Sequence, residues 1–216
     1  MTKEAVTSLR RGGRPSKEQA GLIEDKILDA AAALFFSEGY GAASIEVIAQ
    51  RAQISKRTFY ARFENKAALF RAVVRRVIQH VRPPDAATDQ LFAGKNLEEI
   101  LRRIAPIILR ASLSPEALSL HRVVLAEATR FPELALIINE QGSRQEAIRR
   151  ISDLLQQDAR AKNRTLANPA FAAEQFLLMV TSGPHRRAMG LGVPMNAQEL
   201  DAWASDTVDL FLNGYG

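Results

Sequence analysis

The chain of 216 residues contains no cysteine and only three histidines. Disulfides and thiolate metal ligands are therefore excluded, and three scattered histidines give no clustered ligand set for a metal. Long apolar runs are also missing, because the most apolar stretch, residues 171–180, is interrupted by Glu174 and Gln175 and is too short to span a bilayer. The first residues are polar and Arg-rich, without the apolar run of a secretion signal. We expect a cytoplasmic protein with no metal, no cofactor and no membrane contact.

The chain also lacks alternating β-branched segments and internal repeats. From Lys17 onward its apolar residues recur at spacings of three and four, which is the period of amphipathic helices. We therefore predict an all-α protein of about nine helices. In this prediction a helix runs from Lys66 to about Arg82, and residues 83–95 form a polar loop after two prolines. One long helix runs from Pro132 through Leu155 although Gly142 weakens its middle. Another opens at Pro169 and reaches about Ser182, and a short helical piece follows Pro184.

Positive charge is concentrated at one end of the sequence. Residues 1–82 carry 15 Lys and Arg against 8 Asp and Glu, a net charge of +7. Residues 83–216 carry 14 against 16, a net charge of −2. A basic segment on a mildly acidic body indicates a polyanionic partner for the first part, although a solvated basic surface without a partner gives the same counts.

Residues 44–70 have the pattern of a short helix, a turn of about three residues and a second short helix. Ser44 and Ser55 are suited to cap the two helices. The apolar positions spaced to pack between them are Ile45, Ile48, Ala49, Ile54 and Phe59. The positions left exposed are Lys56, Arg57, Thr58, Tyr60, Ala61 and Arg62. This is the pattern of a helix-turn-helix, which places its second helix in the major groove of DNA.

The same segment resembles the tetracycline-repressor (TetR) family, whose usual wording is approximately Thr-x-x-x-Ile-Ala-x-x-Ala-Gly-Val-Ser-x-Gly-Thr-Leu-Tyr-x-His-Phe-x-x-Lys-x-x-Leu. The positions that match in type and spacing are Ser44, Ile48, Ala49, Ala52, Ile54, Ser55, Thr58, Phe59, Tyr60, Phe63, Lys66 and Leu69. Gly13-Arg14-Pro15, Gly39-Tyr40 and the Arg-Phe-Pro-Glu-Leu of residues 130–134 also resemble the family. The strong match covers about residues 20–70.

Three positions depart from the family pattern. Gln53 stands where the family has a turn glycine, usually in a left-handed conformation that costs another residue about 1 kcal/mol. Arg57 replaces a small residue at the start of the second helix, and Arg62 replaces a histidine.

The resemblance implies which residues contact DNA. The implied phosphate contacts are Ser44, Lys56, Thr58, Tyr60, Arg62 and Lys66, with Ser55 beside them. We expect Arg57, assisted by Thr58 and Tyr60, to read bases, because an Arg fork on guanine is the most common specific contact. Two alternatives stay open: the Tyr60 ring packs beneath its helix, and Lys66 is a solvated first residue of the next helix. Arg10, Arg11 and Arg14 either enter the minor groove or have no DNA contact.

On this resemblance the chain divides into a flexible basic arm, residues 1–17, a helix-turn-helix DNA-binding domain, 18–65, and a larger helical domain for effector binding and dimerisation, 66–216. Segments of about 169–190 and 197–213 correspond to the two long helices that form the family's dimer seam. Core helices of a monomer would have the same apolar pattern. Two copies would bind a two-fold symmetric operator, with their two DNA-reading helices about 34–36 Å apart or a multiple of that distance.

The family also implies a small-molecule effector. The candidate ligand contacts are polar residues in or beside apolar helices: His121, Arg122, Glu127 and His185. An internal ion pair or a surface position is the alternative for each. The predicted function is a sequence-specific DNA-binding transcriptional regulator, a repressor released by an apolar or amphipathic effector, and not an enzyme. An all-α enzyme is disfavoured because no nucleophile–base pair, Gly-rich phosphate loop or metal spacing occurs. A helical partner-binding module would lack the steep salt dependence of DNA binding.

Overall fold

The computed structural model describes residues 17–81, 85–94, 96–141 and 144–214. These residues form eleven helices and no strand. The helices are α1 (Lys17–Glu38), α2 (Ile45–Arg51), α3 (Lys56–Tyr60), α4 (Lys66–Val81), α5 (Asp85–Phe92), α6 (Leu97–Ser112), α7 (Pro115–Glu127), α8 (Glu133–Gln141), α9 (Arg144–Ala161), α10 (Pro169–Ala188) and α11 (Ala197–Asn213). The all-α prediction is confirmed.

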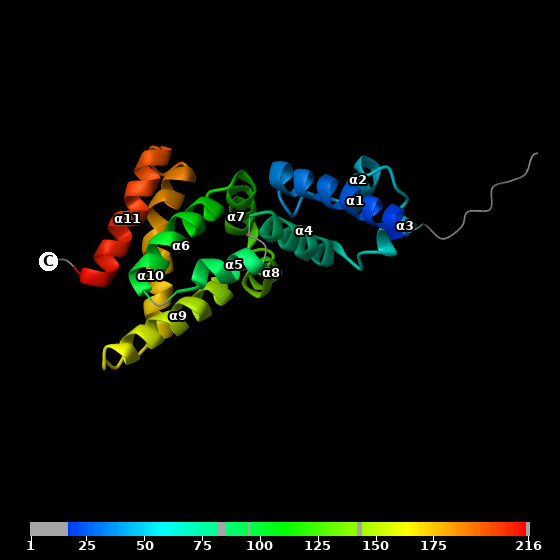
Figure 1. Ribbon diagram of the computed structural model, residues 1–216. Coiled ribbons are helices and arrows are strands. Elements are labelled where there is room, and N and C mark those ends of the chain that lie inside the picture. The colour runs from blue at the N-terminus through cyan, green and yellow to red at the C-terminus, as the bar shows by residue number, and fades with distance from the viewer. Residues whose placement is uncertain (1–16, 82–84, 95, 142–143, 215–216) are drawn as a thin grey trace, which may run out of the picture.

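The molecule is elongated, with α1–α4 at one end and α9–α11 at the other (Figure 1). Helices α5, α7 and α8 lie between these ends, and α6 lies beside α10 and α11. Residues 1–16 of the expected arm, including Arg10, Arg11 and Arg14, lie outside the described residues. Within the described ranges, no helix is both long and apolar enough to cross a membrane.

The apolar faces of the helices meet in two hydrophobic clusters. The first joins α1–α4 to α7 and α8, and Phe35, Phe59 and Phe70 are completely buried in it. The second joins α6 to α9, α10 and α11 around Phe176 and Leu101. Complete burial of each such side chain contributes about 1.5–3 kcal/mol, so both clusters are substantial cores. Helices α7 and α8 therefore pack with the N-terminal helices, although they are far from them in sequence.

Two helices more than predicted are present, for local reasons. The segment read as a loop contains α5, which packs through Leu91 and Phe92 against the second cluster. The expected single helix after Pro132 is divided into α8 and α9, which lie on either side of residues 142–143. Burial of the α5 side chains against the body overrides the polar composition of that segment, which alone indicates a loop.

Helix α10 continues through Pro184 to Ala188, beyond the end near Ser182 that the sequence predicts. A proline has no N–H to donate to the carbonyl four residues earlier. Here the indole N–H of Trp203 in α11 donates to that carbonyl, of Val180, at 3.0 Å. The ring fits closely beside Gly183, since a Cβ there would lie 2.6 Å from the Trp203 ring. A side chain from another helix thus supplies the missing donor.

Candidate DNA-binding and effector sites

Both helices of the helix-turn-helix have serine caps, as predicted. The Ser44 hydroxyl accepts from the backbone N–H of Val47 at 3.2 Å, and the Ser55 hydroxyl accepts from that of Thr58 at 3.1 Å. The hydroxyls of Ser55 and Thr58 also lie 2.9 Å apart and share a hydrogen bond. These contacts fix the start of α3, and they occupy the side chains of both serines.

The turn between α2 and α3 requires a left-handed residue at Gln53, where φ is +55°. The next residue, Ile54, donates its N–H to the carbonyl of Ala49 at 3.0 Å, which closes the end of α2. The expectation that position 53 takes the family's left-handed conformation is therefore confirmed. A residue with a Cβ pays about 1 kcal/mol for it.

Helix α3 is held from below by apolar contacts. Ile48 and Phe59 are completely buried, and Ala49 is nearly so. Ile45 and Ile54 are half-buried against the same cluster. The five residues predicted to pack between the two helices therefore do so, and α3 is fixed to a rigid support rather than to a loop.

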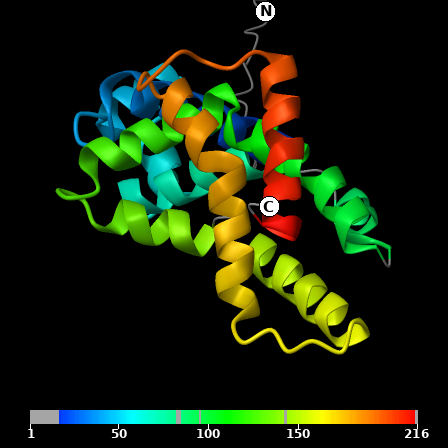
Figure 2. The ribbon, with the colours of Figure 1, turned by 90° about the vertical axis from the view of Figure 1, so that its left-hand side faces the viewer.

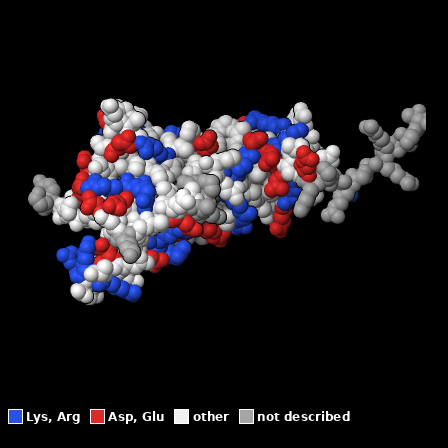
Figure 3. Space-filling model, viewed as in Figure 1, with Lys and Arg blue, Asp and Glu red and all other residues white. Residues whose placement is uncertain are grey.

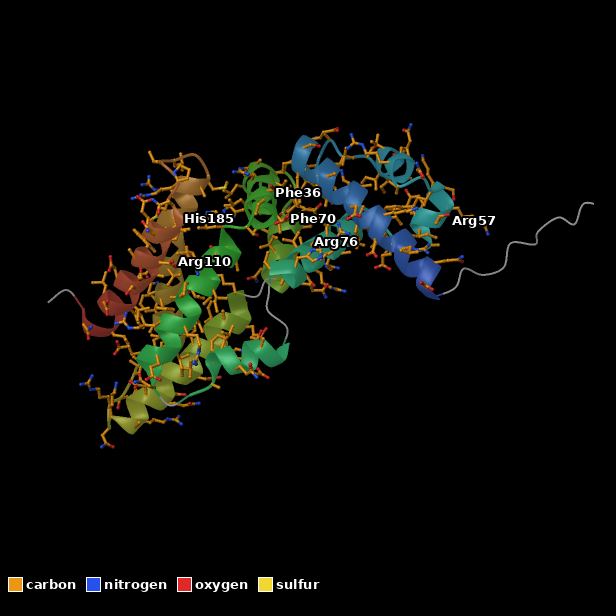
Figure 4. All side chains as sticks on the ribbon, turned by 45° about the horizontal axis from the view of Figure 1, so that its top comes forward. Phe36, Arg57, Phe70, Arg76, Arg110 and His185 are labelled. Atoms are coloured by element: carbon orange, nitrogen blue, oxygen red, sulfur yellow. The ribbon has the colours of Figure 1, made fainter. Side chains whose placement is uncertain are left out.

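The outward side of α3 presents Arg57 and Tyr60. Arg57 is exposed and projects from the end of the molecule, and its guanidinium has no partner among the described residues (Figure 4). The side chain of Tyr60 is 53% exposed, with its ring edge against Phe59 at a centroid distance of 5.4 Å. The alternative in which the Tyr60 ring packs beneath the helix is therefore wrong.

Two further cations flank this surface. The Lys56 ammonium donates to a carboxylate oxygen of Glu46 in α2, which lowers the pKa of Glu46. Arg62, half-buried, directs its guanidinium to the carbonyl of Thr58 at 3.5 Å. Both groups lie next to the reader helix, and the exposed ion pair at Lys56 is weak enough to be exchanged for a phosphate.

The side chain of Lys66 is bonded within the protein. Its ammonium donates to the carbonyls of Tyr40 at 2.8 Å, Ala43 at 3.1 Å and Gly41 at 3.2 Å. It also lies 4.6 Å from the centre of the Tyr40 ring. An ammonium has three N–H donors, so all are used within the protein, and burial lowers its pKa. In this structure the ammonium holds the loop between α1 and α2, so it is not solvated and has no N–H left for a phosphate.

Glu127 holds the same loop from the other side. From the end of α7 its carboxylate accepts the N–H of Gly41 at 2.6 Å. A Cβ on Gly39 would lie 2.3 Å from one of its oxygens, and a Cβ on Gly41 would lie 2.7 Å from the other. Only glycine permits this approach at both positions. Glu127 is not in the cavity wall described below, so its assignment as a ligand contact is wrong.

Tyr40 completes the link between this loop and the body. Its ring packs edge-on against Phe131 at 5.1 Å, and its hydroxyl donates to Glu133 at 3.5 Å. Burial, with the nearby charges of Glu133 and Glu127, raises the pKa of Tyr40 to about 12. In the sequence, Gly39-Tyr40 and residues 130–134 match the family pattern as two separate segments. Nothing in the sequence indicates that they are in contact.

A cavity of about 610 Å³ lies in the body, between the two hydrophobic clusters. Its walls come from seven helices, α4–α10. Among the predicted ligand contacts, His121 and His185 line it. Arg122 is exposed outside the wall and donates to the carbonyl of Ala188 at 3.4 Å, so its assignment as a ligand contact is wrong.

The two histidines of the wall meet each other. His121 on α7 and His185 on α10 have ring centroids 4.4 Å apart in an edge-to-face arrangement (Figure 4 labels His185). His121 is exposed and His185 is half-buried. Partial desolvation lowers the pKa of both imidazoles, and for His185 the nearby charges of His121 and Arg122 lower it further. Both rings are therefore neutral at neutral pH.

Family models match the two ends of the chain. The model described as bacterial regulatory proteins of the tetR family matches residues 27–73. The model described as the C-terminal domain of AefR-like transcriptional repressors matches residues 99–216, more than half of the chain. The chain belongs to the TetR family.

Solved structures of TetR regulators agree with this assignment. A TetR-family transcriptional regulator from Mesorhizobium loti is 28% identical, with a TM-score of 0.72 over 92% of this chain and 98% of that one. The flavonoid-responsive regulator FrrA is 29% identical, with a TM-score of 0.69 over 89% and 96%. A TetR-family regulator from Pseudomonas syringae pv. tomato is 24% identical, with a TM-score of 0.65 over 87% and 94%, and shows the fold alone. No curated protein matches the chain.

As a TetR-family member, the protein is a DNA-binding transcriptional regulator, and proteins of this family are generally not enzymes. The surface of its N-terminal end is less basic than the first 82 residues as a whole. Residues 17–81 carry ten Lys and Arg and seven Asp and Glu, and both signs are visible on the face in Figure 3. The remaining positive excess of that region belongs to residues 1–16 and Arg82, so the described surface offers positions for individual contacts rather than a uniform basic field.

Proposed function

We propose that the protein is a homodimeric repressor that binds a two-fold symmetric operator and is released by a small molecule in its central cavity. One observation carries the proposal. Helix α4 begins at Lys66, six residues after α3 ends, and its last turns place Val77, Ile78 and Val81 in the cavity wall. A ligand in the cavity therefore contacts the same helix that adjoins the DNA reader.

On the DNA side, the proposed base reader is Arg57, assisted by Thr58 and Tyr60. The exposed guanidinium of Arg57 on the rigid helix α3 supports this role. We assign phosphate contacts to Lys56 and Arg62 and to the helix start at Ser44, where N–H groups attract anions. Ser55 acts through the cap that fixes α3 and not through a contact of its own.

For dimerisation we propose the outer faces of α10 and α11, which lie at the end of the molecule away from α3 (Figure 2). Phe171 and Leu210 are exposed there by 57% and 46%. Ala173, Phe176, Leu177 and Val180 of α10 are buried within the protomer. Trp203 and Phe211 also turn inward, so the proposed seam depends on the exposed set.

On the effector side, ligand binding would shift the population of dimers toward a reader spacing that does not match the operator. Such a shift requires different ligand affinities for the two spacings. The cavity volume of about 610 Å³ is typical of small-molecule sites. The similar regulator FrrA is described as flavonoid-responsive, which supports a ligand-controlled role here. With this role we propose residues 18–65 as the DNA-binding domain and 66–216 as the effector and dimerisation domain.

The DNA-binding part is tested with an inverted repeat from the DNA just upstream of this reading frame. Fluorescence anisotropy would compare that duplex with a scrambled one for Arg57→Ala and for the control Arg164→Ala, an exposed arginine beyond α9. We expect Arg57→Ala to weaken binding to the repeat by about 10-fold or more and to change binding to scrambled DNA far less. The control should bind both as the wild type does. Equal losses on both duplexes would contradict the role of Arg57.

A further inference from the structure

The cavity that we propose for the effector has mostly apolar walls. Its large apolar side chains are Val77, Ile78, Val81, Leu91, Phe92, Ile107, Ile108, Leu120, Val124, Ile138, Leu177 and Leu178. They come from six of the helices, so a ligand would meet apolar surface on several sides. A ligand that fills this space gains affinity mainly from buried apolar area.

The cations of the wall are already neutralised. Arg150 donates to Asp89 at 2.8 Å and to Glu146 at 3.0 Å. Arg144 is paired with Glu174 at 3.2 Å. Two guanidinium groups thus face three carboxylates, and an incoming anion would have to displace one of them. A charged group taken from water into an apolar site without a counter-charge is strongly disfavoured.

The polar part of the wall suits a neutral group. The exposed His121 and the half-buried His185 are in contact. Partial desolvation lowers the pKa of both, so the neutral form predominates near pH 7. A neutral imidazole has one donor and one acceptor nitrogen. A hydroxyl group also donates and accepts, so it can bond to both rings at once, and a carbonyl can accept from one of them. A carboxylate only accepts.

We propose that the effector is an uncharged, largely apolar molecule whose hydroxyl or carbonyl group binds the His121–His185 pair. This inference rests on the proposed role of the cavity as the effector site. Arg122 does not provide a counter-charge for an anionic effector, because its guanidinium lies outside the wall and is bonded to the carbonyl of Ala188.

The test uses three ligands of one shape: biphenyl, 4-phenylphenol and biphenyl-4-carboxylate, titrated into the full-length protein by calorimetry at pH 7.5. We expect the phenol to bind most tightly, about 5-fold better than biphenyl because of its hydrogen bonds. The carboxylate should bind at least about 10-fold more weakly than the phenol. Equal or tighter binding of the carboxylate would overturn the proposal, and so would the absence of binding by all three.

Histidine variants locate the polar contact. His121→Phe and His185→Phe should each reduce the preference for the phenol over biphenyl while biphenyl still binds. His80→Phe is the matched control, since the remaining histidine is exposed on α4 outside the wall and should not matter. A phenol preference that survives both cavity variants would refute the assignment.

The effect of each ligand on DNA affinity is measured in parallel. It distinguishes a failure of the proposed ligand class from a failure of the proposed release of DNA. If the phenol binds with the expected preference but leaves DNA affinity unchanged, the ligand class stands and the proposed release fails. If the carboxylate binds and releases DNA, effector control stands and the neutral class is wrong.

Discussion

Lys66 shows how one residue of the family pattern can serve the fold. Its position at the start of α4 suggests a phosphate contact, because helix N-termini attract anions. Its side chain instead reaches back to three carbonyls in the loop between α1 and α2. At the residue scale, the role of each charged group near α3 therefore follows from the groups it is bonded to. Variants of these residues should differ in their effects on stability and on DNA affinity.

Lys66→Ala should lower the free energy of unfolding by about 2 kcal/mol, because it leaves three half-buried carbonyls without their charged donor. Urea denaturation measures this loss. The salt dependence of DNA affinity should not change. The exposed Lys56→Ala is the control: it should change stability little and reduce the salt slope by about 0.9 for each lost phosphate contact. A reduced slope with unchanged stability in Lys66→Ala would restore the phosphate assignment.

Gln53→Gly should raise the free energy of unfolding by up to about 1 kcal/mol, because φ at this position is +55° and glycine adopts it without strain. The control is Gln50→Gly on the exposed side of α2, which should lower stability by about 1 kcal/mol because a helical glycine costs backbone entropy. Thermal or urea unfolding distinguishes the two. A loss in Gln53→Gly equal to that in Gln50→Gly would contradict the strain argument.

Local features of the site could be predicted from the sequence. The serine caps and the buried Phe59 follow from rules that span three or four residues, and the left-handed turn from the family pattern. The partners of Lys66 and Glu127 could not, since Gly41 and Glu127 are 86 residues apart. No spacing rule relates a glycine loop to the end of a distant helix. His121 and His185 line the cavity, but the same rule also selected Arg122 and Glu127, which do not, and the contact between the two rings required the fold.

At the scale of elements, helix α7 contacts both the cavity and the loop that precedes α2. Its first half places Leu120 and His121 in the cavity wall, and its end places Glu127 against Gly41. The loop that contains Gly41 leads directly into α2. A shift of α7 would therefore reach the DNA-binding helices through this hydrogen bond and through the apolar contacts of α7 with α1 and α4.

Glu127→Ala should release this loop. We expect faster hydrogen exchange of the backbone amides in residues 39–43, measured by mass spectrometry, and a loss of about 2 kcal/mol in unfolding free energy. Glu127→Gln keeps an oxygen acceptor without the charge, so its effect should be smaller. Unchanged exchange in the alanine variant would show that the loop does not depend on this contact.

Helices could be predicted where the apolar periodicity of the sequence agrees with the packing of the segment. They could not be predicted where contacts with distant residues decide the structure. The stripe of α4 is evident in the sequence, and the helix is present over nearly the predicted range. Helix α5 and the end of α10 were not predicted. The first depends on contacts of Leu91 and Phe92 with the second cluster, and the other on the indole of Trp203.

At the scale of the whole molecule, the proposed dimer depends on the exposed faces of α10 and α11. Phe171→Glu combined with Leu210→Glu should give a folded monomer, because each places a charge where we expect an apolar seam. Light scattering after gel filtration measures the mass, and circular dichroism the helix content. Affinity for the two-fold operator should fall at least about 100-fold, since two linked readers gain affinity over one.

Leu136→Glu is the control for this pair, because Leu136 is 62% exposed but lies on α8, which within the described residues packs mainly against α4 and α7 and not against α10 or α11. It should leave the mass and the operator affinity unchanged. A double variant that stays dimeric would place the seam elsewhere.

The most direct measurement is the stoichiometry on DNA, obtained by analytical ultracentrifugation of the protein with a labelled duplex that carries the upstream inverted repeat. Two protomers should bind each duplex, and scrambling one half of the repeat should abolish specific binding at moderate salt. One protomer per duplex, or equal binding to the intact and half-scrambled repeats, would contradict the account.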